Sequence, residues 1–184
     1  DVLAAAFFDA DKALRSSPRG SFDHEESGCT CVVVVRKGDF LITANVGDSR
    51  AVLASAAKKE SALKSFSTTK SVSFDKNRRS TNETQSLVLA TDLSSDHKPD
   101  RSDEKARIER TGFGCVERAR DGFFGFAGPY RVWRSDTSPR SGGLAVSRAF
   151  GDTKLAKAGV TSTPEISAHD LRSALEERRR FGVD

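Results

Sequence analysis

Hydrophobic positions in the first third of the chain change from a helical to a strand period. From Val2 to Leu14, apolar residues recur every three or four positions and most charged residues lie off this stripe, which predicts one amphipathic helix. Cys29–Val35 is β-branched and apolar on both faces, so it predicts a central strand covered on both sides. Phe40–Asn45 and Arg50–Ala54 are two further short apolar runs. We therefore expect an antiparallel meander of these three strands.

The turn between the last two runs is the first candidate for chemistry. Gly47, Asp48 and Ser49 are residue types that tight turns favour, because glycine accepts positive φ and aspartate can bond its own backbone. A generic hairpin turn accounts for them without any function. The alternative is that Asp48, at the tip of a hairpin with apolar flanks, reaches a metal ion.

Two polar stretches interrupt the apolar pattern without dividing the chain. Residues 56–86 form a polar basic insertion, either a solvated loop or a functional segment, and residues 134–141 form a short polar insertion. A strand at Leu87–Thr91 follows the first insertion and is expected to pair with the strand before it. We therefore expect one domain over residues 1–184, with a charged tail at 167–184 that holds at most a short surface helix.

Between the insertions the pattern predicts one helix and two short strands. The helix is expected from about Asp103 to Arg110, with Ile108 as its main apolar anchor. The strands are expected at Phe113–Val116 and Tyr130–Trp133. Candidates for the N-cap and the C-terminal stop of the helix are Asp100 or Ser102, and Gly112.

The net charge of +4 does not by itself indicate a nucleic-acid partner. Seven Lys or Arg but only three Asp or Glu fall within residues 56–86, so the rest of the chain is neutral. No basic and aromatic alternation accompanies this excess, and we expect no nucleic-acid partner. No apolar run approaches the roughly 18 residues of a membrane span, so no membrane partner is expected. We expect a monomer.

Cysteine and methionine usage bears on the protein's location and completeness. Three cysteines do not suit a disulfide framework, which favours an intracellular location, cytoplasmic or nuclear. The chain contains no methionine, which indicates a fragment or a processed product.

A second informative stretch is Gly142–Asp152, with the sequence GGLAVSRAFGD. Its glycines and small apolar residues predict backbone packed tightly beside a polar centre. A buried Arg148 requires a carboxylate partner, and Asp152 or Asp48 would serve.

Several segments taken together resemble the metal-dependent protein phosphatase family, also called protein phosphatase 2C. They occur in the family's order and cover most of Val2–Ile166 apart from the two insertions. The resemblance implies an α+β fold, namely a four-layer α-β-β-α sandwich of two antiparallel β-sheets flanked by helices, incomplete here. The segments are SGCTCVVVV, FLITANVGDSRAVL, LSSDHKPDRSDEKARIERTGFGCV, RVW, GGLAVSRAFGD and GVTSTPEI.

The resemblance also implies a reaction and a cofactor. Family members remove phosphate from phosphoserine or phosphothreonine in protein substrates, using two Mg²⁺ or Mn²⁺ ions that share a bridging water. The family's core metal motifs, Asp-Gly-His-Gly-Gly upstream and Asp-Gly and Asp-Asn downstream, are absent from this chain. It therefore resembles a partial domain lacking both ends. Asp121–Gly125 imitates the first motif, but it lies on the wrong side of the first helix and has no His. We expect no catalytic residue in this chain.

Of the family's metal residues, only one carries over to this sequence. It is Asp48, at a third and weaker metal position. His97 is expected to be structural, and His24 and His169 are expected to be solvated. Residues that match the surrounding motifs are expected to support the site structurally: Gly47, Ser49, Arg50, Ser147, Arg148, Gly151 and Asp152.

Three hypotheses remain open. The first is a fragment of an active serine/threonine phosphatase, inactive alone because the core metal ligands lie elsewhere in the parent protein. The second is a catalytically inactive pseudophosphatase that acts as an interaction scaffold. The third is a basic binding module centred on residues 56–86. Extending the reading frame on both sides separates the first two, because the missing motifs are either present or absent there.

Overall fold

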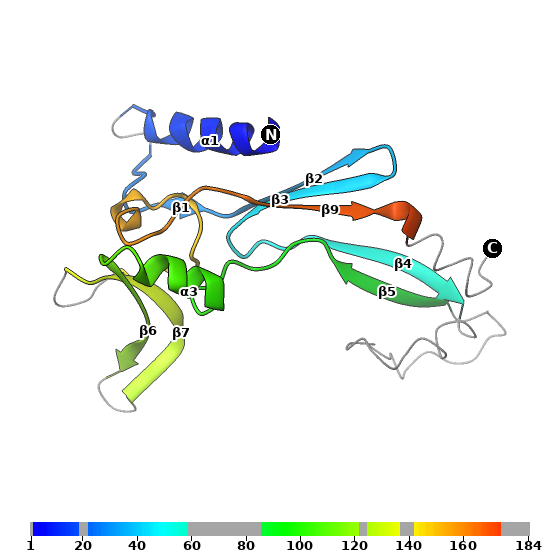
Figure 1. The fold of residues 1–184 in the computed structure, drawn as a ribbon. Coiled ribbons are helices and arrows are strands. Elements are labelled where there is room, and N and C mark those ends of the chain that lie inside the picture. Colours follow the sequence, from blue (N-terminus) through cyan, green and yellow to red (C-terminus); the bar gives the residue numbers. More distant parts are fainter. Residues whose placement is uncertain (1, 19–21, 59–85, 122–124, 137–141, 174–184) are drawn as a thin grey trace.

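The fold is of the α+β class, and its sheets are antiparallel (Figure 1). The computed structural model describes residues 2–18, 22–58, 86–121, 125–136 and 142–173. No helix in these ranges is long and apolar enough to cross a membrane. In chain order the elements are α1 (Val2–Arg15), β1 (Gly28–Cys29), β2 (Cys31–Lys37), β3 (Phe40–Val46), β4 (Val52–Lys58), β5 (Ser86–Asp92), α3 (Ser102–Glu109), β6 (Gly114–Asp121), β7 (Gly125–Arg134), β8 (Phe150–Gly151), the 3₁₀ helix η1 (Thr153–Leu155) and β9 (Glu165–Asp170).

Strand β3 is the centre of a sheet with the order β2-β3-β9. It pairs with β2 from Cys31↔Val46 to Lys37↔Phe40 and with β9 from Phe40↔Asp170 to Asn45↔Glu165. Among the described strands β2 therefore lies at the sheet edge, and the central position predicted for Cys29–Val35 was wrong. Val34 and Val35 are 41% and 40% exposed. A run that is apolar on both faces shows that burial is tolerated, but it does not specify which strands flank it.

The predicted three-stranded meander is also wrong, because β3 and β4 belong to different sheets. β4 pairs with β5, from Val52↔Asp92 to Lys58↔Ser86, which confirms the pairing predicted for Leu87–Thr91. The stretch Gly47–Arg50 is therefore not a hairpin turn. It carries the chain from one sheet to another. Turn residues specify that the backbone changes direction, but they do not select its next hydrogen-bonding partner.

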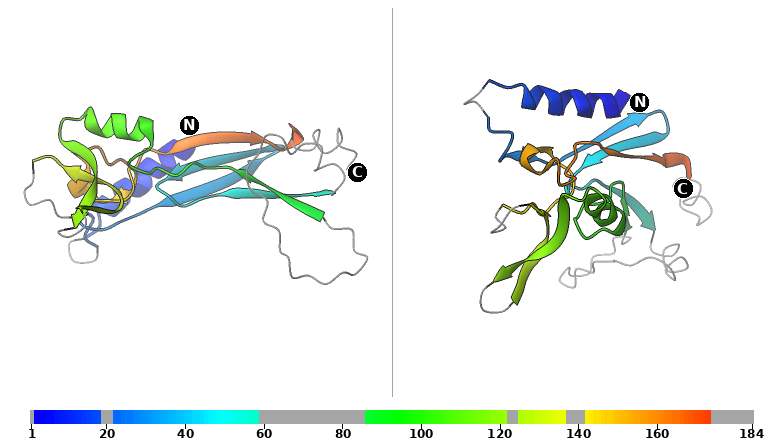
Figure 2. Two further views of the ribbon diagram at one scale, coloured as in Figure 1. Left: turned by 90° about the horizontal axis from the view of Figure 1, so that it is seen from below. Right: turned by 60° about the vertical axis from the view of Figure 1, so that its left-hand side comes forward.

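Helix α1 covers one face of the β2-β3-β9 sheet (Figures 1 and 2). Phe7 packs with Ala44, Val46 and Phe150, and the ring centroids of Phe7 and Phe150 lie 5.3 Å apart. The helix predicted for Val2–Leu14 is confirmed. Asp11, which the sequence pattern placed off the apolar stripe, is only 4% exposed, because its carboxylate accepts hydrogen bonds from the backbone N–H of Gly151 and from Ser162.

A second core lies between α3 and the two-stranded sheet β6-β7. Ile108 is fully buried there, as predicted. The predicted N-cap was wrong, since Arg101 occupies the cap position and makes no side-chain cap bond. Strands β6 and β7 extend beyond the predicted runs at Phe113–Val116 and Tyr130–Trp133. The described residues of this core are Ile108, Val116, Val132, Val146, Ala149, Leu155, Ala158 and Val160.

Parts of the predicted insertions and tail belong to regular strands. Residues 56–58 and 86 extend β4 and β5, residue 134 ends β7, and residues 167–170 form the second part of β9. Most of the first insertion (59–85), five residues of the second (137–141) and the end of the tail (174–184) lie outside the described residues.

Candidate functional site

The candidate site begins at Gly47, where β3 ends and the chain turns towards β4. Gly47 has φ +93°, a conformation that L side chains rarely adopt. A Cβ at this position would lie 2.2 Å from Cγ2 of Thr30 and 3.2 Å from the carbonyl oxygen of Arg148. The Oγ of Ser49 lies 2.6 Å from Oγ1 of Thr30. The loop Gly47–Arg50 therefore packs closely against Thr30, between β1 and β2, and against the backbone of Arg148 in the Gly142–Asp152 stretch.

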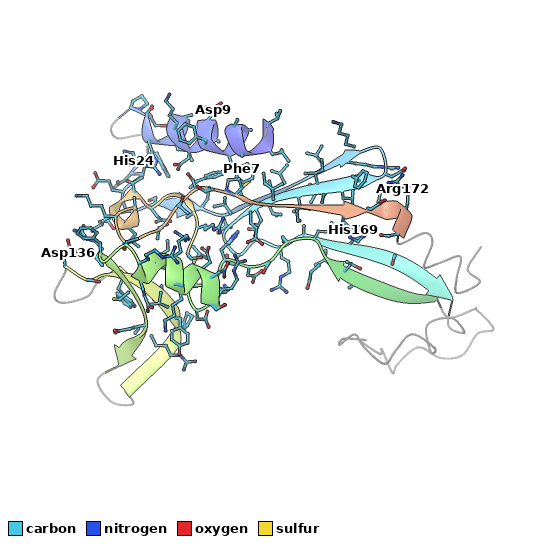
Figure 3. All side chains as sticks on the ribbon, viewed as in Figure 1. Phe7, Asp9, His24, Asp136, His169 and Arg172 are labelled. Atoms are coloured by element: carbon cyan, nitrogen blue, oxygen red, sulfur yellow. The ribbon has the colours of Figure 1, made fainter. Side chains whose placement is uncertain are left out.

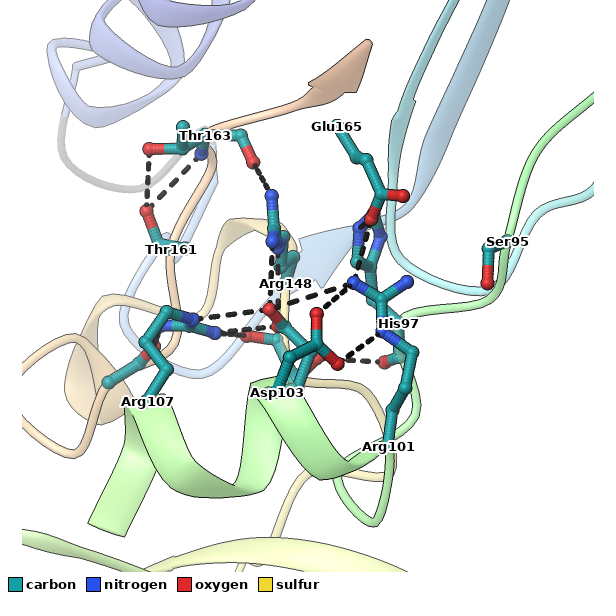
Figure 4. A network of polar contacts seen from close by, with 12 residues as sticks. Ser95, His97, Arg101, Asp103, Arg107, Arg148, Thr161, Thr163 and Glu165 are labelled. Atoms are coloured by element: carbon teal, nitrogen blue, oxygen red, sulfur yellow. Dashed lines mark hydrogen bonds and ion pairs between the residues drawn. The ribbon is translucent and has the colours of Figure 1, made fainter. Parts of the chain in front are cut away.

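His97 holds the Gly47 peptide on both sides. The Gly47 N–H points at the imidazole Nδ1 of His97 at 3.1 Å, and the His97 N–H donates to the Gly47 carbonyl at 3.0 Å. The other ring nitrogen, Nε2, lies 3.1 Å from the carboxylate of Glu165 at the start of β9 (Figure 4). The side chain is fully buried. Burial, together with the positive charges of Arg148 and Arg101, lowers the pKa of His97 below its ordinary value of 6.5.

Asp48 follows Gly47 and faces a cation of the protein itself. Its carboxylate pairs with the ammonium group of Lys98, and its side chain is 35% exposed. The next charged residue, Arg50, makes a bidentate pair with Asp96, with N–O distances of 3.0 and 2.9 Å. The hydrogen bond from Arg50 lowers the pKa of Asp96. Each charge of this loop is thus matched by a residue of the 96–98 turn.

Glu104, on the first turn of α3, is the centre of a buried network, and its partners Arg107 and Arg148 are labelled in Figure 4. Its carboxylate accepts hydrogen bonds from Arg148 at 2.7 and 3.2 Å, from Arg107 at 2.7 and 3.2 Å, and from the Ser147 hydroxyl at 2.6 Å. The partner of Arg148 is therefore Glu104, and the prediction of Asp152 or Asp48 was wrong. Burial alone would raise the pKa of Glu104, but the hydrogen bonds from Arg148, Arg107 and Ser147 outweigh it and hold the pKa well below the ordinary 4.5.

The His97 contacts and the Glu104 network are joined at two points. Arg101 donates to Glu165 at 2.7 Å and lies 3.9 Å from the Glu104 carboxylate, so it connects the carboxylate that His97 contacts with the Glu104 network (Figure 4). The backbone N–H of Ser147 donates to the His97 carbonyl at 2.8 Å. The structure thus brings together the predicted residues Gly47, Asp48, Ser49, Arg50, Ser147 and Arg148, although Gly47 and Ser147 are a hundred positions apart in the chain.

Gly151 and Asp152, the remaining predicted residues, belong to a neighbouring part of the fold. Gly151 pairs with Gly28 in the short β1-β8 sheet, and Asp152 has φ +45° and donates its backbone N–H to Ser27. Burial, with the nearby negative charge of Glu26, raises the pKa of Asp152. These residues support the loop that docks on α1.

Sequence reasoning missed two residues of the site and assigned two histidines wrongly. Glu104 lies four positions before the buried Ile108, a spacing that places both on one helix face, and this was the available signal for its burial. Nothing in the sequence indicated the ion pair between Lys98 and Asp48, because the two residues lie fifty positions apart. His24 and His169, both labelled in Figure 3, are half-buried rather than solvated, and His24 contacts the Thr153 hydroxyl at 2.9 Å.

Asp48 alone does not provide a metal centre. Within the described ranges, no group of three or more His, Cys, Asp or Glu side chains is placed to hold an ion. Beside the site, a cavity of about 270 Å³ is lined by residues including Asn45, Asp92 and Glu165. Glu165 is already engaged by His97 and Arg101, and Asp48 by Lys98. The side chains that the structure describes therefore do not fit a dinuclear centre by themselves.

Comparison with known proteins places these features in a family. A sequence model of the family Protein phosphatase 2C matches residues 1–177. Probable protein phosphatase 2C 48 of Oryza sativa subsp. japonica is 37% identical over 167 residues, which are 90% of this chain and 38% of that protein. Probable protein phosphatase 2C 69 of Arabidopsis thaliana is 35% identical over 175 residues, which are 95% of this chain and 35% of that protein. The chain spans well under half the length of these relatives.

A solved structure supports the same assignment at the level of fold. The crystal structure of serine-threonine phosphatase 2C from Toxoplasma gondii superposes with a TM-score of 0.60 at 21% identity, covering 91% of this chain and 45% of that chain. The resemblance in sequence motifs and the expected α+β fold are both confirmed. Because the family model matches nearly the whole sequence, this chain belongs to the protein phosphatase 2C family.

Proposed function

We propose that this chain is part of a serine/threonine protein phosphatase that hydrolyses phosphoserine and phosphothreonine in protein substrates with the help of Mg²⁺ or Mn²⁺. The observation that carries the proposal is family membership over residues 1–177. Such ions supply an activated water and neutralise phosphoryl charge. The proposal places the core metal ligands in sequence outside this chain, because the described side chains do not form such a centre.

The part of this chain in the proposal is to build and hold the Asp48 loop. Carboxylate oxygens suit Mg²⁺ and Mn²⁺, and the Asp48 side chain is partly exposed. Asp48 would serve as a ligand of a third, weaker metal position. Its contact with Lys98 means that a cation at this position has to displace or share an existing ion pair.

The proposal extends to partners and location. The substrate is a phosphoprotein, the protein acts as a monomer inside the cell, in the cytoplasm or nucleus, and it needs neither a nucleic acid nor a membrane. The local character of the basic excess supports the absence of a nucleic-acid partner, since all of it falls within residues 56–86.

One observation favours a second candidate, a catalytically inactive relative that acts as an interaction scaffold. The only carboxylate carried over from the family's metal residues is neutralised by Lys98 in this structure. In that case the scaffold shared with the family would serve for binding, and the core metal ligands would be absent from the complete protein.

Phosphopeptide hydrolysis separates these candidates. The protein expressed from its complete reading frame is expected to hydrolyse a phosphothreonine peptide with Mn²⁺ and to lose activity in EDTA, whereas the 184-residue chain alone is expected to be inactive. A folded complete protein without activity would favour the scaffold. Robust EDTA-sensitive activity of the 184-residue chain would overturn our placement of the metal ligands.

A further inference from the structure

The backbone N–H and carbonyl of Gly47 together make three hydrogen bonds with His97 and Asn45. Its N–H points at His97 Nδ1 at 3.1 Å, and its carbonyl accepts from the backbone N–H of His97 at 3.0 Å and from the Asn45 amide at 3.2 Å. All these groups are buried, where a backbone donor left without an acceptor is destabilising because water cannot replace the lost partner. The arrangement therefore requires Nδ1 to offer a lone pair to the Gly47 N–H.

This direction assigns the tautomer of His97. A backbone N–H can only donate, and in a neutral imidazole one nitrogen donates while the other accepts. If Nδ1 accepts from Gly47, the ring proton must be on Nε2. There it points at Glu165, whose Oε2 lies 3.1 Å away. The contacts at the two ring nitrogens are therefore consistent with one tautomer, in which Nδ1 accepts from Gly47 and Nε2–H donates to Glu165.

The opposite tautomer is disfavoured at both ends of the ring. A proton on Nδ1 would face the Gly47 carbonyl at 3.2 Å, but it would leave the Gly47 N–H without its acceptor. It would also direct the Nε2 lone pair at a carboxylate. Burial alone would raise the pKa of Glu165, but the hydrogen bond and the charge of Arg101 lower it overall, so Glu165 is an ionised acceptor.

We propose that His97, as the neutral Nε2–H tautomer, is the positioning residue of the loop that carries Asp48. Its Nδ1 fixes the Gly47 peptide, and Glu165, held in turn by Arg101, fixes the ring. The direction of Asp48 is thus set by a chain of contacts that runs from β9 through His97 to the end of β3. The hydrogen-bonding role is independent of catalysis, and only its effect on turnover rests on the proposed phosphatase function.

Nuclear magnetic resonance tests the tautomer in the unmodified chain. The sequence contains one Val–Gly pair, Val46–Gly47, so ¹³C-carbonyl valine with ¹⁵N glycine yields a single signal for the Gly47 amide. Three histidines occur, and His24→Gln and His169→Gln assign the ring nitrogens by elimination. With histidine also ¹⁵N-labelled in the ring, we expect a protonated Nε2, an unprotonated Nδ1, and a ¹⁵N–¹⁵N coupling across the hydrogen bond from Gly47 to Nδ1. A protonated Nδ1 at pH 7 overturns the proposal.

Two substitutions at His97 form a matched pair. In His97→Asn the amide oxygen takes the place of Nδ1 and can accept from Gly47, whereas in His97→Gln the amide reaches the place of Nε2 and leaves Gly47 without an acceptor. We expect the Gly47 amide to keep its shift and slow exchange in His97→Asn and to exchange at least tenfold faster in His97→Gln. Equal exchange in both variants contradicts the proposal. If neither variant folds, the tautomer measurement still decides.

The consequence for catalysis is measured separately in the complete protein. His97→Gln is expected to lower kcat more than His97→Asn, with little change in KM for a phosphopeptide. If the complete wild-type protein is inactive, the proposed function fails while the Gly47 measurements remain valid. If the wild type is active and both variants match it, His97 supports the fold without positioning the loop for the reaction.

Discussion

Arg148 and Glu104, forty-four positions apart, form a buried ion pair with N–O distances of 2.7 and 3.2 Å. The Glu104 side chain is 1% exposed and that of Arg148 is 13% exposed. The same carboxylate also receives Arg107 and the Ser147 hydroxyl. One acid on α3 therefore ties this helix to the segment that leads into β8.

Replacing Glu104 tests this connection. Glu104→Ala removes the buried carboxylate shared by two partly buried arginines, and we expect a loss of about 3–5 kcal/mol in the free energy of unfolding. Glu104→Gln keeps the shape and one acceptor oxygen and should lose less. Urea unfolding measures both. The matched control is Glu109→Gln on the same helix, where the exposed carboxylate pairs with Lys105 at 3.8 Å and a change within about 0.5 kcal/mol is expected. Equal effects at both positions would contradict the network.

Stability should fall on acidification, in two steps with different causes. His97 has a lowered pKa in the folded protein, so the unfolded chain binds more protons below pH 6.5, and stability is lost as the pH falls from there through the lower folded pKa. Glu104 also has a lowered pKa, so its stabilisation is present above pH 4.5 and is lost as the pH falls below that value. Urea unfolding as a function of pH measures the slope.

His97→Asn serves as the control for the first step. An asparagine does not titrate, so the decline between pH 6.5 and pH 4.5 should become shallower, whatever the stability of the variant at neutral pH. A wild-type protein whose stability is flat over this range would show that His97 is not held neutral by its surroundings.

Gly47→Ala should destabilise the fold more than an alanine at another glycine of positive φ. The added Cβ at Gly47 meets Thr30 at 2.2 Å, whereas at Gly38, with φ +59°, nothing lies within 4 Å. Gly38→Ala is expected to cost about 1–2 kcal/mol from backbone strain alone. Gly47→Ala adds steric overlap with Thr30 to this strain, so its unfolding temperature should be clearly lower than that of Gly38→Ala. Similar unfolding temperatures of Gly47→Ala and Gly38→Ala would mean that the segment around Thr30 moves away from the added Cβ at little cost in stability.

Asp48→Asn tests the proposed role of the loop in the complete protein. We expect turnover of a phosphopeptide to fall by about tenfold or more, an effect of roughly 1.4 kcal/mol on the barrier, while tight Mn²⁺ binding and unfolding are largely retained. Asp39→Asn, in the hairpin between β2 and β3, is the control and should leave turnover unchanged. Complete loss of tight Mn²⁺ binding in Asp48→Asn would mean that Asp48 belongs to the core centre instead.

The spacing of apolar residues along the chain predicted an element correctly where that element packs against a single partner. The period of Val2–Leu14 predicted α1, and the apolar runs at Phe40–Asn45 and Leu87–Thr91 predicted β3 and β5. The pairing of β5 with β4 was predictable as well, because a strand that resumes after an insertion returns to its earlier neighbour. Asp11 shows where this reasoning fails. Its burial depends on the Gly151 amide and on Ser162, which pattern along α1 does not reveal.

The sequence by itself determined the family, the helices and most strands, and the identity of the Asp48 loop, because these depend on residue type and short spacing. Tertiary structure alone decided that Gly47–Arg50 links two sheets, that Glu104 receives Arg148, and that His97 holds Gly47. Each of these three features depends on which distant segments meet. From the sequence alone, β3 could pair with either β4 or β9, and Arg148 could form an ion pair with any acidic residue close to it. The packing of α1 and α3 on their sheets determines which of these partners meet, and a local sequence pattern contains no information about that packing.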